Sequence, residues 1–134
     1  MTRTGVDDEH RKKRNREYQA KWFERNRETQ RQRVRANNDV ARERNIGIII
    51  EYLSSHPCVD CGESDIVVLE FDHVRGEKCA SVTTAVKNAW SEEKLRLEID
   101  KCEIRCCNCH RRKTAKDFNW YKANAPVSPH SYKV

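Results

Sequence analysis

The sequence has little of what builds a large apolar core or a membrane span. Of its 134 residues, 37% are hydrophobic and 7% are aromatic, and there are one Met, three Pro and four Gly. The longest apolar run, residues 46–50, is interrupted by Gly47 and is far shorter than the roughly 20 residues that cross a bilayer. The opening residues MTRTGVDDEHRKKR contain no apolar segment of the kind found in signal peptides. This composition argues against a membrane protein and a secreted protein, and it favours a soluble protein inside the cell.

Cysteine, by contrast, is abundant. Seven cysteines in a chain with a mean hydropathy of −1.00 indicate that disulfides or a metal ion add to its stability. Four of them form two C-x-x-C units, with 44 residues between Cys61 and Cys106. Two such units are the usual way to close a tetrahedral thiolate site around Zn²⁺, so we predict a structural zinc site. Its ligands are Cys58, Cys61, Cys106 and Cys109.

Two other interpretations of these cysteines stay open. The units could be redox motifs or ordinary buried cysteines, although a redox motif needs only one copy and neither copy lies in a thioredoxin-like βαβ pattern. His110 could also replace Cys109 in a Cys₃His site. We expect Cys102 to lie in the core on the apolar face of a helix, and Cys107 to point away from the ion.

The positive charge is concentrated in the first third of the chain. Residues 1–45 hold 14 Lys+Arg against 8 Asp+Glu, whereas residues 46–134 hold 13 of each. Because this basic segment is rich in Arg, Glu, Gln and Lys, we predict that it is helical. An excess of this size favours a polyanionic partner, with Tyr18 and Trp22 anchoring the helix to the body or to a base; a merely solvated helix is the alternative. The cations expected to contact phosphates are Arg11, Lys12, Lys13, Arg14, Lys21 and Arg25.

A second helix is predicted over residues 39–54, with Asp39 as its N-cap and Pro57 ending it before the first cysteine pair. We divide the chain into a basic helical arm of residues 1–54, a zinc-containing domain of residues 55–118 and a tail of residues 119–134.

Within the central domain, local patterns predict an α+β fold. The β-branched run at residues 66–71 predicts a strand, with Asp72 and His73 at its end. Ser91 is placed to cap a helix that runs to about residue 100. A short extended segment near Ile104 and a last helix that begins in the second cysteine pair complete the prediction.

The Asp-His pair and the histidine after the second cysteine pair carry chemistry. Neighbouring residues on a regular strand point to opposite faces, so one can bind a metal while the other reaches a water. Asp72 is a hard oxygen ligand suited to Mg²⁺ or Mn²⁺, and His110 offers an imidazole nitrogen from the last helix. His73 can act as a general base near neutral pH. The cations expected to hold the flanking phosphates are Arg75, Arg111, Arg112, Lys113 and Lys116.

Over about residues 56–118, the segments LEFDHVRG and RCCNCHRRKT resemble the HNH endonuclease family. The resemblance implies a ββα-metal fold braced by a four-cysteine zinc site. It also implies that His73 is the general base, that Asp72 and His110 bind the catalytic metal, and that the reaction leaves a 3′-hydroxyl and a 5′-phosphate. The Asn in the middle of the family motif has no counterpart, because residues 99–105 contain none.

The sequence therefore predicts a metal-dependent HNH endonuclease that contains structural Zn²⁺, uses Mg²⁺ or Mn²⁺, and acts on double-stranded DNA. We expect it in the cytoplasm of a bacterium or a phage-infected cell, as a homodimer or in an assembly with phage or bacterial DNA-processing proteins. One alternative is a zinc-containing nucleic-acid-binding module without catalysis. Another is a protein-interaction domain whose basic arm binds an acidic partner.

Overall fold

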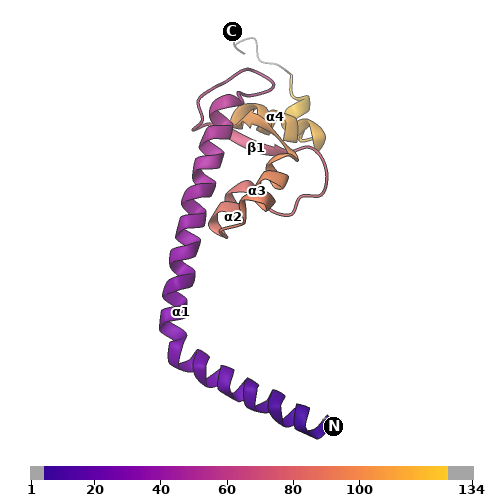
Figure 1. The fold of residues 1–134 in the computed structure, drawn as a ribbon. Helices are drawn as coiled ribbons and strands as arrows, with labels where there is room; N and C mark the ends of the chain where they lie inside the picture. Colours follow the sequence, from indigo (N-terminus) through magenta and orange to yellow (C-terminus); the bar gives the residue numbers. More distant parts are fainter. Residues whose placement is uncertain (1–4, 127–134) are drawn as a thin grey trace. The chain divides into compact units, whose positions relative to one another are not determined.

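The computed structural model of the protein describes residues 5–126 (Figure 1). The chain divides into two compact units, Met1–Val40 and Ala41–Val134. Its described part holds four α-helices, one 3₁₀ helix and a two-stranded antiparallel sheet, which confirms the α+β class. Residues 1–4 of the predicted arm and residues 127–134 of the predicted tail lie outside the described residues. In chain order the elements are α1 (Gly5–Ser55), β1 (Leu69–His73), α2 (Val82–Lys87), α3 (Glu92–Ile99), β2 (Cys102–Cys106), α4 (Cys107–Asp117) and η1 (Tyr121–Asn124).

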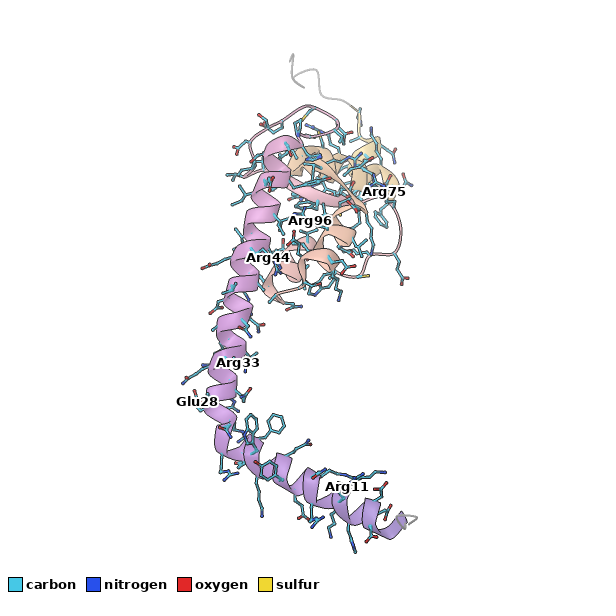
Figure 2. The ribbon with its side chains drawn as sticks, in the orientation of Figure 1. Arg11, Glu28, Arg33, Arg44, Arg75 and Arg96 are labelled. Atoms are coloured by element: carbon cyan, nitrogen blue, oxygen red, sulfur yellow. The ribbon has the colours of Figure 1, made fainter. Side chains whose placement is uncertain are left out.

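Helix α1 is a single helix of 51 residues, so the prediction of a separate helix with Asp39 as its N-cap is wrong. The reason is that no Gly or Pro interrupts residues 6–46, and residues with good helix propensity fill that stretch. In the first unit its charged side chains project from the helix surface, as Figure 2 shows for Arg11, Glu28 and Arg33. None of the described helices, α1 included, carries a stretch long and apolar enough to cross a bilayer.

The last turns of α1 belong to the core of the second unit. Ile48 packs in one buried cluster with residues of α2 and α3, and Leu53 packs in a second cluster with residues of the sheet. Residues 41–54, which we assigned to the arm from the sequence, therefore supply core contacts. In Figure 1 this part of α1 lies beside α2, α3 and β1.

Strands β1 and β2 pair antiparallel, with Leu69 opposite Cys106 and His73 opposite Cys102. Strand β1 begins at Leu69, three residues later than the predicted start at residue 66. The cause is a turn at Asp65, whose carboxylate accepts a hydrogen bond from the Val67 N–H at 3.0 Å. Asp72 and His73 are the last two residues of β1, so the pair lies at the end of the strand as predicted.

Three helices complete the second unit. The predictions for α3 and α4 are confirmed, and the Ser91 hydroxyl caps α3 by accepting the Lys94 N–H at 3.3 Å. Helix α2, which the sequence analysis missed, is capped in the same way by Ser81. Cys102 is buried in the core as expected, but on strand β2 and not on a helix, because α3 ends at Ile99.

Candidate metal centre and active site

The two C-x-x-C units come together in space. Cys58, Cys61, Cys106 and Cys109 each offer a sulfur atom, and these atoms all lie within 4.8 Å of one another. The Sγ atoms of Cys61 and Cys106 are 3.7 Å apart. A tetrahedral zinc site with Zn–S bonds of about 2.3 Å requires sulfur–sulfur separations of about 3.8 Å. The cluster therefore has the spacing to hold a metal ion such as zinc.

Local backbone geometry presents these sulfurs. After α1, the Gly62 N–H donates to the Cys58 carbonyl at 2.9 Å and closes the first loop. Gly62 has a φ of 77°, a left-handed conformation that a residue with a side chain adopts only at a cost. In the second pair, Cys106 is the N-cap of α4, and its Sγ accepts the Cys109 N–H at 3.4 Å. The positive end of a helix dipole favours a thiolate there.

The cysteine pKa values diverge within the cluster. Burial and a hydrogen bond with Cys106 raise the pKa of Cys109, whereas backbone hydrogen bonds outweigh burial and lower the pKa of Cys58. Four thiols in contact do not all ionise without a compensating charge, so this donor set suits a divalent cation. Cys107 is exposed and is not a member of the cluster, as the sequence predicted.

A second set of possible ligands forms where β1 meets α4. Asp72 Oδ1 lies 3.5 Å from His110 Nε2. Two neighbouring ligands of a magnesium ion, each about 2.1 Å from it, are separated by roughly 3 Å. The two atoms that the sequence proposed as ligands of a divalent metal are therefore brought together at close to the required spacing, and their oxygen and nitrogen donors suit Mg²⁺ or Mn²⁺.

The other oxygen of Asp72 is engaged by cations. Its Oδ2 accepts a hydrogen bond from Arg105 Nη1 at 2.7 Å and lies 3.6 Å from Lys113 Nζ. Arg105 is nearly buried and also pairs with Asp60 and Glu103. Asp72 thus presents one oxygen to His110 and the other to a buried guanidinium.

Glu70 belongs to this site although the sequence analysis did not single it out. Its Oε2 lies 2.7 Å from His110 Nδ1. With this hydrogen bond on Nδ1, the imidazole turns Nε2 toward Asp72. A carboxylate on the far nitrogen commonly orients a metal-binding histidine. The available signal was the strand alternation, because residues 70 and 72 share one face of β1.

His73 lies on the other face of β1, as the alternation predicts. Its Nε2 is 2.9 Å from Glu98 Oε1 on α3, and 12% of the His73 side chain is exposed. Nothing in the sequence marks Glu98 for a role at this site. The two histidines of the candidate active site are therefore each paired with a carboxylate, one on each face of the strand.

The cations predicted to hold phosphates differ in their surroundings. Arg75 is turned back onto the protein and donates to the carbonyls of Asp100 and Cys102, so it is less available than predicted. On α4, Arg111 lies over the Trp120 ring, 5.7 Å from its centroid. A hollow of about 340 Å³ beside the cysteine cluster is lined mainly by charged residues, namely Asp60, Arg105, Arg112, Lys113, Lys116 and Asp117 together with Cys109. The six predicted cations of the arm are all exposed: Arg11, Lys12, Lys13, Arg14, Lys21 and Arg25.

Comparisons of this chain with protein-family models, with curated proteins and with solved structures each find no match.

Proposed function

We propose that the protein is a metal-dependent HNH endonuclease that hydrolyses phosphodiester bonds in DNA. One observation carries the proposal: Asp72 Oδ1 and His110 Nε2 lie 3.5 Å apart across the junction of β1 and α4. The order β1, β2, α4 beside a four-cysteine cluster supports it, because the segments LEFDHVRG and RCCNCHRRKT resemble that family.

In this proposal the residues divide the chemistry between the two faces of β1. Asp72 and His110 would hold Mg²⁺ or Mn²⁺, and Glu70 orients the His110 ring. A divalent ion at these ligands would supply charge stabilisation to the scissile phosphate and to the leaving oxygen. His73 takes a proton from the attacking water. The 3′-hydroxyl and 5′-phosphate products follow from the family resemblance.

The exposed cations account for affinity to DNA without sequence preference. Those of the arm line one long helix, and Lys and Arg that neutralise phosphates release counterions. The hollow beside the cysteine cluster adds Arg112, Lys113 and Lys116, and of these Lys113 lies 3.6 Å from Asp72. A scissile phosphate at the candidate metal would therefore lie next to cations that can hold its neighbours.

A nucleic-acid-binding module without catalysis is the second candidate, and one observation favours it. The Arg105 guanidinium already pairs with Asp72 at 2.7 Å, which reduces the negative charge that would attract a divalent cation. Such a module would use the same arm and the same zinc-type cluster.

Cleavage of supercoiled plasmid by the zinc-loaded chain distinguishes the two candidates. We expect nicking or linearisation that requires Mg²⁺ or Mn²⁺, is lost in His73→Ala and Asp72→Ala, and survives in His56→Ala. His56 is a suitable control because it is exposed and lies outside both sites. Salt-sensitive DNA binding without cleavage under either metal would reject the nuclease and favour the module.

Salt dependence also tests the partner itself. Binding through phosphates weakens steeply as salt rises. DNA binding that does not change between low and physiological salt, or no binding at all, would contradict both candidates and favour a protein-interaction domain.

A further inference from the structure

Glu98 is the most deeply buried carboxylate of the described residues, with 2% of its surface exposed. It lies on the face of α3 that also buries Leu95 and Ile99. Moving a charged carboxylate out of water costs several kcal/mol unless hydrogen bonds and opposite charges replace the lost water. Its neighbours must therefore compensate for that loss.

Three donors from three segments surround Glu98. Its Oε1 lies 2.9 Å from His73 Nε2 and accepts the Cys79 N–H at 3.0 Å, while its Oε2 accepts from Lys101 Nζ at 2.8 Å. Lys101 in turn donates to the Glu77 carbonyl at 2.7 Å. No buried side-chain nitrogen or oxygen in the described part of the chain lacks a hydrogen-bond partner. The carboxylate is thus fixed in position from several sides.

These contacts determine which proton His73 carries. Burial raises the pKa of Glu98, but hydrogen bonds from Lys101, the Cys79 N–H and His73 outweigh it and lower the pKa to about 2. Glu98 is therefore ionised at neutral pH and can only accept. A neutral His73 must then carry its hydrogen on Nε2, which leaves the lone pair on Nδ1.

We propose that Glu98 is the positioning residue of His73: it fixes the imidazole ring and its Nε2–H tautomer, so that Nδ1 is the atom that accepts the proton of the attacking water. This inference rests on the proposed nuclease function and adds the residue that prepares its base. Glu98 does not touch the substrate, and it acts only through His73.

The step balances without a further reactant. A water O–H bond breaks and its proton goes to His73 Nδ1, while the water oxygen forms a bond to phosphorus. The P–O3′ bond breaks and leaves its electron pair on O3′, which takes a proton from solvent. Glu98 stays ionised and stabilises the imidazolium that forms, as a buried carboxylate does beside a catalytic histidine.

The alternative is that Glu98 has only a structural role and holds α3 against the segment 77–79. That role requires the contacts with Lys101 and Cys79, and it does not depend on the tautomer of His73. The two roles therefore differ in what happens at the His73 ring and in the turnover rate, not in stability.

The experiment uses the zinc-loaded full chain labelled with ¹⁵N-histidine. The ¹⁵N shifts of His73, assigned with His73→Ala, report its tautomer in the wild type and in Glu98→Gln, and plasmid cleavage gives kcat and KM for the same proteins. Glu93→Gln is the matched control, since Glu93 is an exposed glutamate in the first turn of the same helix.

We expect the Nε2–H tautomer in the wild type and in Glu93→Gln, and a mixture of tautomers in Glu98→Gln. The kcat of Glu98→Gln should fall about 10- to 100-fold, part of the 10²- to 10⁴-fold that a general base contributes, with KM unchanged. An Nδ1–H tautomer in the wild type, which needs no variant to measure, would overturn the proposal. So would a wild-type kcat in Glu98→Gln. If the wild type cleaves nothing, the nuclease function fails and the catalytic role of Glu98 fails with it, while the spectrum still reports separately whether the ring is held.

Discussion

Removal of the metal from the cysteine cluster should unfold the second unit. Besides cysteine, the buried core in the described part of this unit comprises eight apolar residues, seven of them Val, Leu or Ile. At roughly 1.5–3 kcal/mol each, these seven contribute on the order of 10–20 kcal/mol. A structural zinc contributes roughly 10–16 kcal/mol of apparent folding energy, which is as large as the net stability of about 5–15 kcal/mol of a small domain. A zinc ion held by these four cysteines would therefore matter about as much as the whole apolar core.

Two cysteine variants make this test specific. Cys109→Ser removes one of the four sulfurs, whereas Cys107→Ser changes an exposed cysteine outside the cluster. We expect one zinc per chain and a cooperative thermal transition, followed by near-ultraviolet circular dichroism, in the wild type and in Cys107→Ser. Cys109→Ser, and the wild type treated with a chelator, should lose both the bound zinc and the cooperative transition.

The opposite outcome has a clear meaning. If Cys109→Ser keeps its zinc and melts like Cys107→Ser, Cys109 is not a required ligand, as in a Cys₃His site completed by His110. The structure argues against that site, because the His110 ring lies against Glu70 at 2.7 Å and is not part of the cluster. A chelated protein that still melts cooperatively would refute the energetic argument itself.

Three further predictions concern individual charged side chains. Arg105→Met should destabilise the zinc-loaded protein by about 3–5 kcal/mol in urea, because it takes the guanidinium away from the buried Asp72 carboxylate. Arg96→Met, which breaks an exposed pair, should change stability by less than about 1 kcal/mol. Replacing Lys12 and Lys13 together by Gln should make the negative slope of log K against log salt for DNA shallower by about 1.8, measured by fluorescence anisotropy. Glu98→Gln should lower the melting temperature most above pH 5. Burial raises the Glu98 pKa, but hydrogen bonds from Lys101, the Cys79 N–H and His73 outweigh it and hold this pKa at about 2 in the folded protein, below its ordinary 4.5. The wild-type advantage is therefore lost as pH falls through that interval. An equal difference in melting temperature at pH 7 and pH 3 would contradict this.

Each half of the cysteine cluster and helix α3 could be predicted because their signals are local. A C-x-x-C loop brings two sulfurs together by itself, and Ser91 with acidic residues after it marks a helix start regardless of the rest of the fold. The same holds for α4, which starts at the second cysteine pair. For such features, short-range chemistry decides the structure.

Features that depend on tertiary pairing could not be predicted in this way. Asn45 is fully buried and donates to the Trp90 carbonyl at 2.9 Å, yet it stands among charged residues in a long helix. Glu98 looks like any acidic residue of an amphipathic helix until His73 and Lys101 are placed around it. The β-branched residues before Leu69 favoured a strand by propensity, and the side chain of one aspartate set the turn instead.

The alternation of β1 also limits how this protein can change in length. Glu70 and Asp72 face His110, while His73 faces Glu98, so deleting one residue within the strand would exchange the two sets of partners. Insertions in the connecting segments outside the strand leave this assignment intact. Among natural variants we therefore expect the five-residue span of β1 to be constant, with length differences confined to connecting segments outside it. Foreign peptides inserted in such segments, away from Cys79 and from the cysteine cluster, should be tolerated where a single added residue in β1 is not.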